Sequence, residues 1–405
     1  MVEVEYVKVK SVIYKVGMME KVMVMMEMAV DDYAIDEKCN LYYKKSTSDR
    51  IEAKCGMEGC KWRIYASLDK DSGRFIVKTF KNVHTCSWNC KIRLLTARKI
   101  AHLILDDLRA DSDLNARKIK KMLLSKYSVV ITKTKCQKAR EIGLKIIEEE
   151  HAEQFARMYD YVLELRQSNP GSTVILGTQN DVFQKFYICF NALKDGWKMS
   201  CRPILHLDGT FLRGWMKDEL LTAVGRDAND QMYHVAWAIV DVENKINWEW
   251  FLTLLVDDLN LGVGQGFTMV SDQQKGLIQA MKNILPYAEH RICAKHIYEN
   301  WKKKHKGSEN RISFWKTAKA YNQVVFDKCL EDLKILSPTV HEDLMRYSIF
   351  HWSRCSFTEF AKCDAVENNM GEAFNSTITD AREKPIVEML ETIRRQVITK
   401  FDATD

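Results

Sequence analysis

The stretch that decides the fold reads Pro203-Ile-Leu-His-Leu-Asp-Gly-Thr-Phe-Leu-Arg213. The apolar side chains that precede Asp208 are typical of a buried strand, and Gly209 follows where that strand is expected to end. A carboxylate is costly to bury without a partner, and a divalent cation is the most specific partner it could have. The other interpretation is an ordinary Asp-Gly turn. Both interpretations stay open on this stretch alone.

The composition predicts an intracellular globular protein with room for several domains. The 405 residues are 46% hydrophobic and 29% charged, which excludes a disordered chain and allows two or three domains. No apolar run reaches the ~18 residues that a membrane span needs. The first 30 residues lack the apolar block and cleavage site of a signal peptide. The 12 cysteines are therefore expected as buried thiols or metal ligands rather than as a disulfide framework.

The positive charge of the chain is concentrated in one block. The net charge is +6, but residues 51–147 hold 22 Lys and Arg against 9 Asp and Glu, an excess of 13. The remainder of the chain therefore carries a net charge of −7. A basic block on an otherwise acidic chain is typical of a module that binds a polyanion such as nucleic acid. A solvated basic face without a partner is the alternative.

Two close pairs of potential metal ligands lie on either side of a predicted hairpin. Cys55 and Cys60 precede its first strand, and His84 and Cys86 follow its second strand. Three thiolates and one imidazole form a tetrahedral zinc set, and the ion would stabilise a small sheet that has little core of its own. Cys90 is a spare candidate for the fourth ligand. The alternative is a set of scattered core cysteines with a surface histidine.

Residues 91–170 are predicted to be helical, with basic side chains on the outer face. Three short helices of this kind suit a helix-turn-helix arrangement on DNA, and a plain helical spacer with solvated lysines is the alternative. The side chains that we expect at a DNA surface are Lys61, Trp62 and Arg63 beside the cysteine pairs, and Arg117, Lys118, Lys120 and Lys121 in the helices.

The hydrophobic period changes from helical to two after 169–172, where we expect a domain boundary. Three antiparallel strands are predicted next, then a helix capped by Asn247, a strand, a second helix and a last strand. This is the order of a ribonuclease-H-like core, in which the first and fourth strands are neighbours. Asp208 and Asp272 would then lie side by side, and Mg²⁺ or Mn²⁺ would offset their repulsion.

The chain resembles the Mutator-like element transposases of plants, the MuDR group, over roughly residues 25–400. The motifs that carry the resemblance are Cys55…Cys60-Lys-Trp62-Arg63…His84-Thr-Cys86, Leu207-Asp208-Gly209-Thr210-Phe211, Ser271-Asp272-Gln-Gln-Lys275-Gly276-Leu277, Arg291-Ile-Cys293-Ala-Lys-His296 and Asn368-Asn-Met-Gly-Glu372-Ala-Phe374-Asn375.

The resemblance implies an α+β multidomain protein. It implies a WRKY-like zinc-bound β domain, a helical segment and an RNase-H-like core of the type that carries two aspartates and a glutamate, with a helical insertion. The expected order is an unassigned segment at 1–24, a MuDR-type zinc-binding DNA-binding domain at 25–90, a helical segment at 91–170, the first part of the core at 171–300, the insertion at 301–360, and a helical end of the core at 361–405 that carries the third acid.

The resemblance also implies the site residues. Asp208, Asp272 and Glu372 match the acidic triad, with Glu367 and Asp364 as substitutes for the third acid. Structural Zn²⁺ and catalytic Mg²⁺ or Mn²⁺ are the implied cofactors.

A further pair, Cys293 and His296, matches a signature near the active site of the family. For this pair we favour a buried thiol and a hydrogen-bonded imidazole over a second metal site.

The implied function is DNA transposition. The protein would bind double-stranded element ends in the nucleus. A homo-oligomer is one possible state, and no membrane partner is expected. It would cleave and transfer strands with two divalent ions about 3.5–4 Å apart, which activate water or a 3′-hydroxyl and stabilise the leaving oxygen.

Two other functions are weighed beside transposition. The first is a domesticated DNA-binding transcription regulator of the far-red-impaired-response type, which needs no catalysis. The second is a stand-alone RNase-H-type nuclease, which leaves the zinc segment unexplained. Family members commonly continue into a zinc knuckle, so a chain that stops at Asp405 leaves a truncated, decayed or domesticated copy open.

Overall fold

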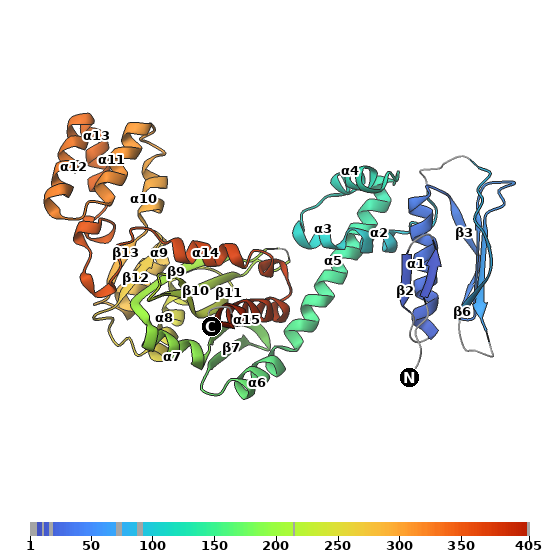
Figure 1. Ribbon diagram of the computed structural model, residues 1–405, viewed down its shortest axis with the longest axis horizontal. Helices are drawn as coiled ribbons and strands as arrows, with labels where there is room; N and C mark the ends of the chain where they lie inside the picture. Colours follow the sequence, from blue (N-terminus) through green and yellow to red (C-terminus); the bar gives the residue numbers. More distant parts are fainter. Residues whose placement is uncertain are drawn as a thin grey trace. The chain divides into compact units, whose positions relative to one another are not determined.

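The computed structural model describes residues 6–9, 12–15, 19–69, 75–86, 92–213 and 215–402, and it forms two compact units, Met1–Glu149 and Glu150–Asp405 (Figure 1). The division falls inside helix α5 (Lys133–Ala156), earlier than the boundary expected at 169–172. That turn instead joins α6 (Met158–Ser168) to strand β7 (Thr173–Gln179) within the second unit. Within the described ranges, no helix combines the length and apolar character that crossing a membrane requires.

The first unit is built on an antiparallel sheet of four strands, β3 (Leu41–Thr47), β4 (Arg50–Cys55), β5 (Arg63–Leu68) and β6 (Phe75–Lys81), in that order. A small hairpin, β1 (Tyr6–Val9) and β2 (Val12–Lys15), and helix α1 (Met19–Asp36) precede it. Ile51, Ala53 and Ile64 point into the core and are at most 1% exposed. The turn expected between β5 and β6 lies outside the described residues.

Helices α2 (Ala97–Leu103), α3 (Leu105–Ala110), α4 (Ala116–Tyr127) and α5 complete the first unit and share its core. Polar caps fix where they begin. The side-chain oxygen of Asn115 accepts the backbone N–H groups of Arg117 and Lys118 at the start of α4. Thr132 accepts the N–H of Lys135 at the start of α5 in the same way.

The second unit contains a mixed sheet of seven strands in the order β13-β12-β9-β10-β11-β8-β7. Strands β9, β10 and β11 are antiparallel, whereas β12 runs parallel to β9 and β13 runs parallel to β12. The predicted adjacency of the first and fourth core strands, β9 and β12, is therefore confirmed. The remaining bounds are β8 (Val182–Cys189), β9 (Cys201–Phe211), β10 (Glu219–Asp227), β11 (Met232–Val240), β12 (Thr268–Ser271) and β13 (Glu289–Ile292).

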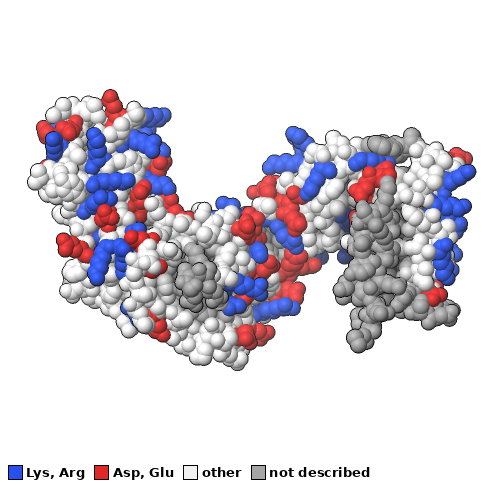
Figure 2. All heavy atoms as spheres, in the orientation of Figure 1, with Lys and Arg blue, Asp and Glu red and all other residues white. Residues whose placement is uncertain are grey.

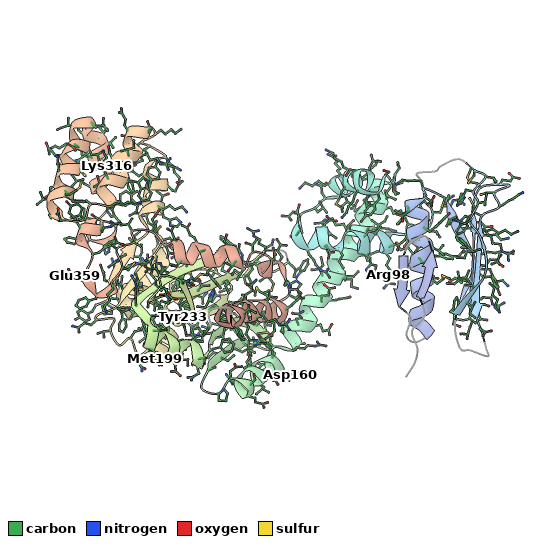
Figure 3. The ribbon with its side chains drawn as sticks, in the orientation of Figure 1. Arg98, Asp160, Met199, Tyr233, Lys316 and Glu359 are labelled. Carbon is green, nitrogen blue, oxygen red and sulfur yellow. The ribbon has the colours of Figure 1, made fainter. Side chains whose placement is uncertain are left out.

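Helices cover both faces of this sheet, as two neighbouring residues of β11 illustrate. The hydroxyl of Tyr233, labelled in Figure 3, donates to the carbonyl of Leu193 in α7 (Asn191–Ser200) at 3.2 Å. The ring of His234 lies 5.0 Å from that of Phe374 in α14 (Asn369–Thr377). Because successive strand residues point to opposite faces, α7 and α14 lie on opposite sides of the sheet.

Three more helices belong to the same core. Helix α8 (Lys245–Leu259) links β11 to β12, α9 (Lys275–Ile284) links β12 to β13, and α15 (Ile386–Asp402) ends the described chain. The predicted capping residue of α8 is wrong by one turn. The side chain of Asn244 accepts the N–H of Asn247 at 2.9 Å, so Asn244 is the N-cap.

A helical insertion separates β13 from α14. It consists of α10 (Ala294–Trp301), α11 (Ser308–Ala318), α12 (Gln323–Leu336), α13 (Pro338–Met345) and three 3₁₀ turns, η1 (Ile349–His351), η2 (Arg354–Ser356) and η3 (Glu359–Ala361). The insertion has its own core, which includes Phe314 and Trp352 with ring centroids 5.6 Å apart. This subdomain therefore stabilises itself while remaining part of the second unit.

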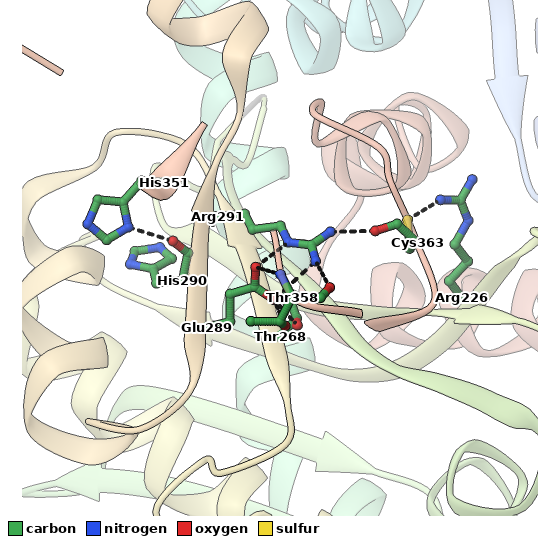
Figure 4. Close-up of polar contacts among 8 residues, drawn as sticks. All are labelled: Arg226, Thr268, Glu289, His290, Arg291, His351, Thr358 and Cys363. Atoms are coloured by element: carbon green, nitrogen blue, oxygen red, sulfur yellow. Dashed lines mark hydrogen bonds and ion pairs between the residues drawn. The ribbon is translucent and has the colours of Figure 1, made fainter. Parts of the chain in front are cut away.

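A buried ion pair ties the end of the insertion to the sheet (Figure 4). The guanidinium of Arg291, whose side chain is 1% exposed, lies 3.0 Å from a carboxylate oxygen of Glu289. Arg291 also donates to the carbonyls of Thr358 (3.1 Å) and Cys363 (2.6 Å), while Glu289 accepts the backbone N–H of Thr358 at 2.9 Å. These contacts anchor the chain just before α14.

Candidate functional site

The first candidate site lies at one end of the four-stranded sheet. Cys55 ends β4, Cys60 lies in the following turn, and His84 and Cys86 follow β6. Their donor atoms all lie within 4.8 Å of one another. The Sγ atoms of Cys55 and Cys86 are 3.5 Å apart, and Nδ1 of His84 is 3.5 Å from Sγ of Cys60. A Cys₃His donor set at this spacing fits a closed tetrahedral zinc site.

The backbone of the turn between Cys55 and Cys60 positions these two side chains. Gly59 has a φ of 76°, a conformation that side-chain-bearing residues rarely adopt. Burial alone would raise the pKa of the Cys60 thiol, but the backbone N–H groups of Trp62 and Thr85 hold it down to about 6. A thiol of this kind is ready to bind a metal ion. The spare candidate Cys90 lies outside the described residues.

Trp62 supports this metal site instead of facing solvent. Its ring stacks on His84 with centroids 5.5 Å apart and on Tyr33 at 5.2 Å, and Tyr33 and His84 themselves stack at 6.2 Å. Its indole N–H donates to Asn82 at 3.3 Å, and the residue is 1% exposed. The expectation that Trp62 contacts DNA is therefore corrected, because a buried indole holds the histidine ligand and is closed to a duplex.

The other side chains expected at a DNA surface are accessible. Lys61, Arg117, Lys118, Lys120 and Lys121 are exposed, and Arg63 is half-buried beside Glu52 at 3.3 Å. In α4 the apolar Ile119 and Leu123 point into the core, which turns the basic residues outward.

The second candidate site lies on β9 and β12. Their parallel register pairs Met269 with Leu205 and Val270 with His206. Asp272 and Asp208 each follow the last pair of this register by two residues, and the charge of Asp272 acts on Asp208. One oxygen of Asp272 accepts the backbone N–H of Gln274 at 2.9 Å. The register thus brings together the two aspartates that the sequence singled out.

Asp208 lies within a strand, so the Asp-Gly turn interpretation is excluded. Strand β9 runs on to Phe211, and the pairing with β10 continues through Gly209. One oxygen of Asp208 accepts the side-chain amide of Asn375 in α14 at 2.8 Å. A Cβ on Gly371 of α14 would lie 2.9 Å from the Cβ of Asp208. Glycine therefore allows α14 to pack directly on this aspartate.

Glu243 is a carboxylate at this site that sequence reasoning missed. It follows β11, and its oxygens would lie 2.7 and 2.8 Å from a Cβ built on Gly209. Its Oε1 accepts the indole N–H of Trp248 at 3.0 Å. The signal in the sequence was Gly209 itself, since a glycine inside a strand marks a close approach by another group.

The charges of these acids act on one another. Burial, followed by the charges of Asp272, Glu243 and Glu372, raises the pKa of Asp208 to about 7. Burial also raises the pKa of Glu243 to about 7, with Asp272 contributing. Several carboxylates that repel each other in a partly buried place are an arrangement that a divalent cation would stabilise.

Glu372 lies in the first turn of α14 and is held by α10. Its Oε2 lies 2.5 Å from the ammonium of Lys295, and its Oε1 lies 4.0 Å from Nε2 of His296. Among the described residues, the three acids do not form a group with all donor atoms within 4.8 Å, whereas Cys293, His296 and Glu372 do.

Neither substitute for the third acid takes the place of Glu372. The side chain of Asp364 is 77% exposed and pairs with Arg354 at 3.2 Å. Glu367 lies near Lys295, where its charge adds to the rise in the pKa of that lysine that the Glu372 hydrogen bond produces first. Besides burial, the charge of Glu372 contributes to the raised pKa of Asp208.

The structure is a two-unit α+β protein with a Cys₃His cluster that could hold a metal ion in one unit and a carboxylate cluster in the other. Residues 11–77 match the MuDR family transposase model, which is a DNA-binding domain, and residues 204–300 match the MULE transposase domain. The two matches support a Mutator-like transposase family. The second match contains Asp208, Asp272, Cys293 and His296. No curated protein matches the chain.

Proposed function

We propose that this protein is a DNA transposase of the Mutator-like type that binds element-end DNA in the nucleus and cleaves and transfers strands with divalent metal ions. The observation that carries the proposal is the parallel pairing of β9 with β12, which supports a close approach of Asp208 and Asp272. The strand order supports an RNase-H-like core, since three antiparallel strands are followed by two parallel strands on the side of the first.

The acids of the second unit fit Mg²⁺ or Mn²⁺, because both ions prefer carboxylate oxygens. Such ions, when bound, activate an attacking hydroxyl and stabilise the leaving oxygen at phosphorus. The protein's own groups orient the ligands. The amide of Asn375 holds one oxygen of Asp208, and the backbone N–H of Gln274 holds one oxygen of Asp272. Glu372 is the third ligand, presented by α14.

DNA would contact basic surfaces on both units. The MuDR match and the exposed lysines of α4 support a DNA surface on the first unit. On the second unit, Lys and Arg side chains line the insertion (Figure 2), including Lys303, Arg311 and Lys316, the last of which is labelled in Figure 3. Residues 301–320 contain seven Lys and Arg and one Glu. Phosphate contacts of this kind fix the position of a duplex without reading its sequence.

A second candidate function is a DNA-binding regulator that keeps the fold without the chemistry. The observation that favours it is the ion pair of Lys295 with Glu372, which neutralises the third acid. In this case the carboxylates would be remnants, and the DNA surfaces would carry the whole function.

A nicking assay separates the two candidates. The full chain is incubated with Mn²⁺ and a supercoiled plasmid that carries element ends. A transposase is expected to nick it, and Asp208→Asn and Asp272→Asn are expected to lower the rate at least about 100-fold while DNA binding persists. Glu359→Gln, an exposed glutamate of the insertion labelled in Figure 3, serves as the control and keeps the rate. A chain that binds DNA without nicking it would favour the regulator.

A further inference from the structure

We propose that Cys293, His296 and Glu372 form a second transition-metal site, which takes Zn²⁺ and competes with Mg²⁺ or Mn²⁺ for Glu372. The inference rests on the proposed function only in treating Glu372 as the third acid. The arrangement of the donor atoms supports the site. The sequence had favoured a buried thiol at Cys293 and a hydrogen-bonded imidazole at His296 instead.

Two elements bring the three ligands together. Cys293 is the residue before α10, and His296 lies one turn further on the same helix face. Glu372 comes from α14, which follows the whole insertion in sequence. One donor atom from each residue lies within 4.8 Å of the other two. A single ion at the centre of such a group would reach all three ligands.

The thiol of Cys293 is held in place by α14. Its Sγ accepts the backbone N–H of Asn368 at 3.2 Å, and the residue is fully buried. The side chain of Asn368 bonds in turn to His206 at 2.9 Å and to the carbonyl of Leu207 at 3.2 Å, both on β9. This N–H fixes the orientation of the sulfur as a potential ligand.

Two polar atoms at this place lack a protein partner. Oε1 of Glu372 and Nδ1 of His296 are buried atoms without a hydrogen bond. Lys295 engages the other oxygen of Glu372, Oε2, at 2.5 Å and therefore leaves Oε1 for another ligand. A buried polar atom without a partner is costly, so these two atoms indicate that something binds between them.

The donor set selects the ion. Thiolate and imidazole ligands favour Zn²⁺ over Mg²⁺, and three protein ligands leave a fourth position open to water. The side chains of His296 and Glu372 are 37% and 30% exposed, so an ion can enter from solvent. Since Glu372 cannot serve two ions through the same oxygen, zinc here would withdraw the third acid from Asp208 and Asp272.

Zinc content of the full chain tests the site without relying on catalysis. We expect two Zn²⁺ per chain by elemental analysis, one in the Cys₃His site and one here. His296→Ala and Glu372→Gln are each expected to weaken the second ion at least about 10-fold, because changing even an outer partner of a metal ligand costs 10–100-fold. Cys329→Ser in α12, outside both sites, is the control and retains two ions.

Cobalt substitution identifies the ligand type. Co²⁺ at the second site is expected to add a thiolate charge-transfer band that Cys293→Ser abolishes. His296→Ala is the second variant, because its half-exposed position can be changed without a risk to folding. One zinc per chain, or two zinc ions that both persist in His296→Ala and Glu372→Gln, would overturn the proposal. These results stand whether or not the plasmid is nicked, so failure of the zinc site and failure of the transposase function are distinguishable.

Discussion

Asp208 and Asp272 each lie two residues beyond the last pair of the β9–β12 register, His206 with Val270, and the charge of Asp272 acts on Asp208. No other parallel register of these strands would align the two carboxylates. Burial and the neighbouring acids then raise the pKa of Asp208 to about 7. The metal-free second unit therefore holds a charge arrangement that costs stability.

Neutralising Asp208 is expected to stabilise the metal-free protein. Asp208→Asn keeps an acceptor for Asn375 and removes a repelled charge, so we expect at least about 1 kcal/mol of added unfolding free energy at pH 7, or about 2–4 °C in Tm. Thermal unfolding in chelator measures it, with the exposed Asp332→Asn of α12 as the control. A lower Tm for Asp208→Asn would show that the carboxylate stabilises the fold.

The gain in Tm from Asp208→Asn is expected to depend on pH. The pKa of Asp208 is higher in the folded chain, about 7, than its ordinary value of 3.8, so the folded chain binds the proton more tightly. The penalty for ionised Asp208 is absent below about pH 4 and is complete above about pH 7. The Tm advantage of Asp208→Asn is expected to grow across this window and then level off. An advantage independent of pH would contradict the assigned cause.

Loss of zinc is expected to unfold the small sheet of the first unit. Cys60→Ser removes one of the four candidate ligands that connect the end of β4 with the segment after β6. Hydrogen exchange of the β4 and β5 amides should accelerate in this variant and in chelator, while that of β9 and β10 stays slow. Cys329→Ser is the matched control. Unchanged protection of β4 in Cys60→Ser would count against a structural ion.

Glu243 is expected to strengthen divalent ion binding. Its carboxylate contacts Gly209 and acts electrostatically with Asp272, so Glu243→Gln removes a negative charge beside the proposed ions. We expect the Kd for Mn²⁺ to rise about 10-fold, equivalent to about 1.4 kcal/mol, by calorimetry. The exposed Glu164→Gln on α6 should leave it unchanged. Equal Kd values for Mn²⁺ in the wild type and in Glu243→Gln would show that Glu243 only accepts the hydrogen bond of Trp248.

The Arg291–Glu289 pair is expected to behave as a buried ion pair. Arg291→Met leaves Glu289 as an uncompensated charge and should cost about 3–5 kcal/mol of unfolding free energy. The double variant with Glu289→Gln should recover part of this loss, since no lone charge remains. Chemical denaturation of all three variants gives the coupling energy. A double variant as unstable as the sum of the two single variants would rule out such coupling.

Much of the fold followed from local patterns. The period of two predicted the core strands, and the spacing of Cys55, Cys60, His84 and Cys86 around one hairpin predicted a cluster that the structure brings together. The adjacency of Asp208 and Asp272 followed from strand order alone, because parallel neighbours align their ends.

Tertiary packing decided the features that the sequence did not predict. Trp62 lies next to two basic residues in the sequence, but the rings of His84, Tyr33 and Phe80 pack around it in the fold. Glu243 follows β11, where we identified no motif in the sequence. Its carboxylate fills the place that a side chain at position 209 would occupy, and only the fold shows this. The meeting of Glu372 with Cys293 and His296 depends on how the insertion returns to the sheet, which no local pattern encodes.

The proposed function requires that Asp208 on β9, Asp272 just after β12 and Glu372 on α14 hold a divalent ion. Crystals of the full chain soaked in Mn²⁺ and measured at the manganese absorption edge test it most directly. The account predicts an anomalous peak between the carboxylates of Asp208 and Asp272, and its loss in Asp208→Asn. Saturating Mn²⁺ with no peak between these two aspartates would contradict it.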